Sequence, residues 1–422
     1  MTNYASYFSF IFLIYISTCI ACTVNTGLFI YPSLSRSLFI EIGILCLAFC
    51  TLCYIIKHRN NEVRIVTNKI NILVVSWIPF IIVHTLFLDV VEEYRTIYLC
   101  LTLFAILPLT YILNAKLLRP QNIELGLILV AVTHLLFIYG QLLDITKSYN
   151  EYFKLTGCNE NPTVTAIYLT GCIPIIAKYA ICSGHRFFYF SLLISSLVAI
   201  VLLHCRSAYL GLCIESLVFL LLRARKSKTL LPAICKYRIA IIFAFLFFTI
   251  PFAVRIYDMK RDSSDSRWLI WKLSAQMITE KPQGYGYGLF EKYYNRKQAD
   301  YFKSGNATVE EKRTASFCNM AYNDYLEQGV EGGLIGISYL AAFYILLVVE
   351  SIRKSSIETT CVVAGLAVMS LTNFIYSSMQ PWWLLICYAS LISSRTNKIN
   401  ICQKYHVPVI VTMALLCTAM FF

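Results

Sequence analysis

The amino-acid sequence predicts an all-α, polytopic integral membrane protein. Of its 422 residues, 58% are hydrophobic and 14% are charged, and the mean hydropathy is +0.65. So few charges cannot cover the surface of a soluble protein of this length, and we expect a lipid bilayer to replace water around most of the chain. Long apolar runs without the alternating pattern of a membrane barrel indicate helices, which satisfy their own backbone hydrogen bonds.

The apolar runs predict about 12 or 13 membrane-spanning helices, each about long enough to cross ~30 Å of hydrocarbon. The first run lacks a basic leading segment and a small-residue cleavage site, so we expect it to be retained as a helix. The last run is short, and an interfacial position is the alternative to a span. The predicted spans are residues 8–30, 38–56, 70–88, 96–113, 123–143, 165–182, 187–203, 208–222, 239–254, 334–350, 359–376, 382–393 and 407–422.

Basic residues lie in short clusters between the apolar runs, in every second loop. This alternation is the positive-inside pattern, which places those loops and the N-terminus in the cytoplasm and the intervening loops outside. The formal net charge of +13 therefore indicates membrane topology and contact with membrane lipids. No nucleic acid is expected as a partner, because no basic patch is interleaved with stacking aromatic residues. The clusters are Lys57, Arg59, Arg64 and Lys69; Lys116 and Arg119; Arg223, Arg225, Lys226 and Lys228; Arg353 and Lys354; and Arg395, Lys398 and Lys404.

One outward segment, residues 255–332, differs in composition from the rest of the chain. It is polar, nearly balanced in charge and rich in Tyr and Gly. Trp268 and Trp271 at helical spacing predict a first helix there. A second helix is predicted over about residues 321–329, broken by Gly332 and Gly333 before the next span. We expect a single membrane domain, residues 1–422, whose functional site lies in this long loop.

Cysteine and histidine form no metal-binding pattern. Most of the 17 Cys residues lie in predicted spans, where thiols behave as small apolar side chains. Cys158 and Cys318 lie in outward loops, and a disulfide between them is left open because the sequence does not fix their separation. The histidines are scattered at unrelated depths, so we expect no metal and no cofactor.

Two arginines are predicted at the outer end of the spans. Arg206 precedes one apolar run directly, and Arg267 begins the first helix of the long loop. Guanidinium groups are planar, permanently charged forks that suit the oxygens of a phosphate or diphosphate. The alternative is that such residues only anchor lipid headgroups, as cations at membrane ends commonly do.

Three motifs follow one another in the second half of the chain. The first is Arg206-Ser-Ala at the start of a span. The second is Asp265-Ser-Arg267, followed by Trp271 and by PQGYGYGLF at 282–290. The third is AYNDYLEQGVEGGLIG at 321–336. Each alone is a weak signal, but in this order and on this topology they resemble the O-antigen ligase and O-antigen polymerase superfamily of bacterial inner-membrane glycan ligases.

The resemblance implies a metal-independent membrane glycosyltransferase. Such an enzyme takes a glycan from undecaprenyl diphosphate at the periplasmic face of the inner membrane and joins it to an acceptor hydroxyl. Residues 255–332 would then be one long periplasmic loop, and Arg206 and Arg267 match the family's two arginines that hold the diphosphate. The acceptor is lipid A core in a ligase, a growing glycan in a polymerase, or a protein in an O-oligosaccharyltransferase. A single long outward loop resembles the ligases more than the polymerases, which tend to have two.

The chain departs from the family pattern in the third motif. The family usually has His before the Asn, whereas this chain has Tyr322 before Asn323. Tyrosine is a poor base, with an ordinary pKa of about 10 against about 6.5 for His. Glu327, one helical turn after Asn323, is therefore the candidate substitute base. The alternative for Tyr322 is interfacial packing.

Further candidate residues lie before the third motif. Gly284, Gly286 and Gly288 would let backbone amides approach a substrate, with Trp271 beside them. The alternative reading of this glycine repeat is a simple turn, because no helix and Lys follow it as in a nucleotide-binding loop.

A transporter or flippase for lipid-linked sugars is the rival from another class. It would need a polar pathway through the bilayer, and the carboxylates near or within spans are few: Glu41, Glu124 and Glu215. A purely structural scaffold would leave the ordered arginine, glycine and Tyr-Asn motifs unexplained.

We predict the topology from the alternation of basic loops. A reporter fused near Asn61 should read cytoplasmic, and one fused near Gly305 should read external. The opposite labelling would place Arg267 on the wrong side of the membrane for a carrier-linked glycan.

Overall fold

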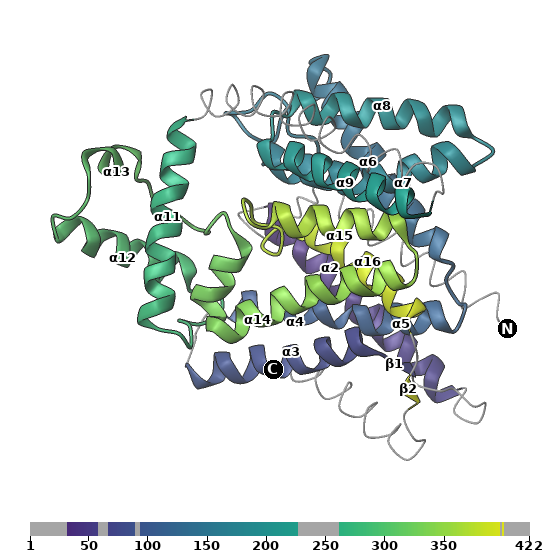
Figure 1. Ribbon diagram of the computed structural model, residues 1–422, viewed down its shortest axis with the longest axis horizontal. Coiled ribbons are helices and arrows are strands. Elements are labelled where there is room, and N and C mark those ends of the chain that lie inside the picture. Colours follow the sequence, from purple (N-terminus) through teal and green to yellow (C-terminus); the bar gives the residue numbers. More distant parts are fainter. Residues whose placement is uncertain (1–31, 58–65, 89–92, 227–260, 397–398, 401–422) are drawn as a thin grey trace.

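A computed structural model describes residues 32–57, 66–88, 93–226, 261–396 and 399–400. Within these ranges the chain is almost entirely helical, which confirms the predicted all-α class (Figure 1). Two short strands, β1 (Val66–Thr67) and β2 (Ile399–Asn400), pair antiparallel. The predicted spans 8–30, 239–254 and 407–422 lie outside the described residues.

Seven helical stretches of the described chain are long and apolar enough to cross a membrane, so the protein is a multi-pass membrane protein. Two shorter apolar helices accompany them, α8 (Arg186–Leu202) and α15 (Ile357–Met369). A total of about twelve spans stays a prediction. The seven stretches lie in α2 (Pro32–Lys57), α3 (Lys69–Phe87), the pair α4 (Glu93–Phe104) and α5 (Ile106–Asn114), α6 (Pro120–Leu142), α7 (Pro162–Cys182), α9 (Arg206–Lys226) and α14 (Asp324–Arg353).

Polar side chains fix where several of these helices begin. Asn68 caps α3 by accepting the backbone N–H of Asn71 at 2.9 Å. Asn161 caps α7, with Pro162 at its first position. An Asn side chain supplies the acceptor that the free N–H groups of a helix's first turn need, and proline lacks an N–H to leave unpaired.

The helix α16 (Met379–Arg395) lies in the centre of the bundle and packs on α5 and α7 (Figure 1). Its side chains are almost all buried, including Trp382 and Trp383. The Trp382 indole N–H donates to Thr102 Oγ1 at 2.8 Å. A buried indole needs such an acceptor, so this bond ties α16 to α4 inside the apolar core.

Beside the bundle, α11 (Arg261–Glu280), α12 (Phe290–Lys303) and α13 (Val309–Thr314) form a smaller body (Figure 1). Its own apolar cluster includes Leu273 of α11 and Phe290 of α12, and extends to Val330 of α14. The ammonium of Lys272 donates to Glu311 at 2.8 Å, and this hydrogen bond lowers the pKa of Glu311 to about 2. The predicted helix around Trp268 and Trp271 is present, as α11.

The helix α14 is broken at Gly333, as predicted, where φ is +66° and ψ is −162°. The turn at residues 281–289 docks into this break. The N–H of Leu334 donates to Pro282 O, and the N–H of Gly286 donates to Glu331 O, each at 2.9 Å. A Cβ at Gly333 would lie 2.3 Å from Pro282 O, and one at Gly284 would lie 2.4 Å from Glu331 O. Both positions also have a left-handed φ, so glycine is required on two grounds.

The predicted span at 359–376 was too long. The helix α15 ends at Met369, and residues 370–378 form a loop. The N–H groups of Ile375 and Tyr376 bond Asp324, and Asn373 bonds Ser207, so this loop's polar groups find partners on other helices instead of continuing α15. The predicted span at 334–350 is the second part of the longer α14.

Gly333→Ala should lower the thermal unfolding temperature of the purified protein in detergent. Forcing alanine into this left-handed conformation costs about 1–3 kcal/mol, and the clash with Pro282 O adds to it. Gly184→Ala is the matched control, because a Cβ there meets nothing within 4 Å. Equal thermal unfolding temperatures for the two variants would contradict the role of Gly333 in docking the turn at residues 281–289.

Candidate active site

The three sequence motifs converge at one end of the helices. Arg206 is the first residue of α9, Arg267 lies in the second turn of α11, and Tyr322 comes just before α14. The guanidinium carbon of Arg267 lies 4.7 Å from the centre of the Tyr322 ring, and its Nη1 donates to the carbonyl of Thr372 at 2.8 Å. The structure therefore brings together segments far apart in the sequence.

The two arginines act on each other electrostatically. Burial lowers the pKa of Arg267, and the positive charge of Arg206 lowers it further. Within the described part of the chain, no carboxylate forms an ion pair with Arg267. Two like charges held close in a half-buried site favour the binding of an anion, which relieves their repulsion.

Tyr322 is held by its neighbours in an unusual backbone conformation. Its φ is +52°, in the left-handed region. Its ring packs edge-on against Phe374, with centroids 5.5 Å apart, and its face meets Arg267. Burial raises the pKa of Tyr322, so its hydroxyl stays protonated near neutral pH and is a still poorer base than a free tyrosine.

Asn323 caps α14. Its Oδ1 accepts the N–H groups of Tyr325 at 3.0 Å and Leu326 at 3.1 Å. The side chain thereby fixes where α14 begins. A direct catalytic role for Asn323 stays a prediction.

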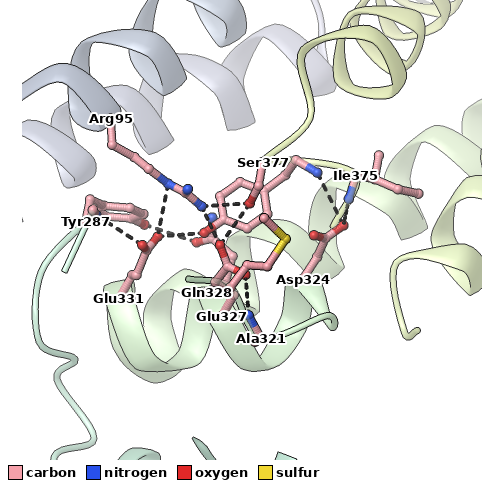
Figure 2. A network of polar contacts seen from close by, with 12 residues as sticks. Arg95, Tyr287, Ala321, Asp324, Glu327, Gln328, Glu331, Ile375 and Ser377 are labelled. Atoms are coloured by element: carbon pink, nitrogen blue, oxygen red, sulfur yellow. Dashed lines mark hydrogen bonds and ion pairs between the residues drawn. The ribbon is translucent and has the colours of Figure 1, made fainter. Parts of the chain in front are cut away.

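Glu327 is fully buried and each of its oxygens is bonded. Oε1 accepts Nη2 of Arg95 at 2.6 Å and the hydroxyl of Ser377 at 2.9 Å. Oε2 accepts the N–H of Ala321 at 2.8 Å, as Figure 2 shows. The role of Glu327 as a base stays a prediction. These contacts favour a structural role, in which Glu327 joins Arg95 to the segment before α14.

Sequence reasoning missed Arg95 and the loop at residues 370–378. Besides Glu327, Arg95 donates to Ser377 Oγ at 2.7 Å and lies 3.7 Å from Glu331 (Figure 2). Its guanidinium also lies over the ring of Tyr376, 4.9 Å from the ring centre. The Tyr376 hydroxyl donates to Glu331 at 2.6 Å. The sequence did hold a signal for a partner of this kind. Asp324 and Glu327 lie at the start of a predicted helix, and buried carboxylates there need a cation such as Arg95.

Trp271 and the three glycines have packing partners. The indole N–H of Trp271 donates to Ala321 O at 3.1 Å. The N–H of Gly286 bonds the backbone of α14, and that of Gly288 bonds the Glu331 carboxylate at 3.0 Å. Gly284 lies against the break in α14. A substrate-binding role for these four residues stays a prediction, and the contacts favour a role in holding the site together.

Cys158 and Cys318 are both buried thiols, and no disulfide joins them. Among the described residues, no group of three or more His, Cys, Asp or Glu side chains is arranged to hold a metal ion. The metal-free reaction stays a prediction.

Fold and site together define a multi-pass membrane protein with an arginine pair, suited to an anionic group, at one end of its helices. A family model described as O-antigen ligase matches residues 190–341, about a third of the chain. This confirms the resemblance to the O-antigen ligase superfamily, and the match includes all three motifs. Residues 190–341 are thus similar to the O-antigen ligase family, within a chain that has the helices of a multi-pass membrane protein. No curated protein matches the chain.

Tyr322→Phe should retain most of the activity, because the ring contacts with Arg267 and Phe374 survive the loss of the hydroxyl. Tyr322→His should retain or raise activity, and should add a pH-dependent limb near the imidazole pKa of about 6.5. Wild type should show no such limb, because the Tyr322 pKa lies above its usual value of 10.0.

The measurement is the rate of glycan transfer in membranes across pH. A strong loss in Tyr322→Phe would instead assign the hydroxyl a direct role in positioning the acceptor or the diphosphate.

Proposed function

We propose that the protein transfers a glycan from undecaprenyl diphosphate to an acceptor hydroxyl at the periplasmic face of the bacterial inner membrane, as an O-antigen ligase with lipid A core as acceptor. One observation carries this proposal. Arg206, at the start of α9, and Arg267, on α11, are near enough to interact electrostatically, and both lie inside the segment that matches the O-antigen ligase family.

The arginine pair suits a diphosphate leaving group. In the transfer, the acceptor oxygen forms a bond to the anomeric carbon while the bond from that carbon to the diphosphate oxygen breaks. Negative charge grows on the departing diphosphate. Arg206 and Arg267 would stabilise that charge in a half-buried site, where electrostatic stabilisation exceeds that in water, and would do so without a metal.

The acceptor hydroxyl must also lose its proton. Tyr322 stays protonated, and Glu327 is engaged with Arg95, Ser377 and Ala321. We infer that the proton leaves late, to water or to the departing diphosphate. Catalysis then rests mainly on orienting the two substrates and on the arginine pair.

The direction of the helices supports a periplasmic site. The helices α9 and α14 begin at the candidate site, and their far ends carry Arg223 and Arg353. Arg395 lies in the last turn of α16, at its C-terminal end. Because clusters of basic residues favour the cytoplasm, the site at the opposite end faces outward.

Arg206→Ala and Arg267→Ala should each reduce glycan transfer by on the order of a hundredfold or more, with normal protein levels in the membrane. Arg267→Lys should rescue poorly, because an ammonium keeps the charge but lacks the two-pronged fork. Transfer is measured from a lipid-linked glycan to lipid A core in membranes.

Arg223→Ala is the matched control, since it removes an arginine from the far end of the same helix as Arg206. Full activity in Arg267→Lys would argue that this residue only anchors headgroups. Normal activity in both alanine variants would refute the proposed reaction centre.

A further inference from the structure

We propose that Arg95 is a positioning residue of this site: acting through Glu327, it holds residues 321–323 so that Tyr322 faces Arg267. The expected effect of Arg95 on glycan transfer rests on the proposed function. The structural part of the inference can be tested without any activity.

An unbroken path of contacts joins Arg95 to the arginine pair. Arg95 Nη2 donates to Glu327 Oε1 at 2.6 Å, and Glu327 Oε2 accepts the N–H of Ala321 at 2.8 Å (Figure 2). Tyr322 is the next residue, and its ring meets the Arg267 guanidinium at 4.7 Å. Arg95 lies on α4, far from the three motifs in sequence, and touches none of the arginine pair itself.

The segment before α14 needs such a tie because it is not helical and includes the left-handed Tyr322. Ala321 is buried, and both of its backbone polar groups are bonded: the carbonyl to Trp271 at 3.1 Å and the N–H to Glu327. An N–H bonded to a carboxylate forms a stronger bond than one to a neutral acceptor. A buried carboxylate also needs a partner of opposite charge, and Arg95 supplies it to Glu327.

Arginine suits this position better than lysine. One guanidinium bonds Glu327 and Ser377, lies near Glu331 and places its flat face on Tyr376. Only a planar, branched cation makes these contacts together. It thereby joins α4, the start of α14 and the loop at 370–378 around one charge.

The first experiment measures the reactivity of a natural thiol. Cys318 lies three residues before Ala321, is buried, and its thiol donates to Met320 O at 2.8 Å. Arg95→Gln should raise its rate of modification by a membrane-impermeant maleimide roughly tenfold or more, because local opening exposes groups that the native contacts protect. The rate is read peptide by peptide by mass spectrometry.

Two controls make the result specific. Cys158 is a buried thiol in the other outward loop, and its labelling should not change. Lys178→Gln removes another half-buried cation from a buried glutamate, Glu124, which it contacts at 2.8 Å, and should leave the Cys318 rate unchanged. Unchanged Cys318 labelling in Arg95→Gln would overturn the inference. Equal rises at both thiols would overturn it too, since they would mean general loosening.

The second experiment separates positioning from binding. Arg95→Gln should lower kcat for glycan transfer by on the order of tenfold or more with little change in the donor KM, because the arginine pair remains but is poorly oriented. Arg95→Lys should recover only part of that loss. A raised donor KM at unchanged kcat would overturn the positioning role. If neither the wild type nor any variant transfers glycan, the proposed function fails. The labelling rate of Cys318 still tests the path of contacts from Arg95.

Discussion

The site depends on one constraint: the carboxylates at the start of α14 are buried, and each must be satisfied by a partner. Asp324 accepts the N–H groups of Ile375 and Tyr376, which fixes the loop after α15. Glu327 binds Arg95, and Glu331 accepts the Tyr376 hydroxyl. An unpaired charge in this position would destabilise the fold strongly. The same contacts that satisfy the charges therefore assemble α4, α14 and residues 370–378 around the site.

A second group of contacts surrounds Arg267. Arg267 bonds a carbonyl and lies on an aromatic ring, and both contacts leave its positive charge uncompensated within the described residues. The positive charge of Arg206 lowers the pKa of Arg267. The acidic residues at the start of α14 thus bond Arg95, Ser377, Tyr376 and backbone N–H groups, whereas Arg267 bonds a carbonyl and an aromatic face.

The sequence predicted the features that depend on local pattern. Apolar runs located most of the described membrane helices, the Gly332-Gly333 pair located the break in α14, and the order of motifs singled out Arg206 and Arg267. The contacts between distant segments were not predictable in this way. In the sequence, Arg95 resembles any cation at a membrane end, and only the structure shows that it bonds Glu327 of α14.

The loop at 370–378 was missed for a related reason. Apolar residues such as Phe374 and Ile375 continue the hydropathy of α15, so the predicted span ran on past Met369. What ends the helix is the set of partners offered by Asp324 and Ser207, which only the packed structure supplies. Likewise, the glycine repeat suggested access for a ligand, whereas the close approach of two backbones explains Gly284 and Gly333.

The break at Gly333 also resolves a mismatch of length. A straight helix of 30 residues would be about 45 Å long, well beyond ~30 Å of hydrocarbon. After the break, residues 334–353 supply about 20 residues, or ~30 Å, which matches the bilayer thickness. The residues before it, with their three carboxylates, are not required to lie among the lipid tails. Gly333 thus divides α14 into an apolar second part of bilayer length and a first part that carries the buried carboxylates.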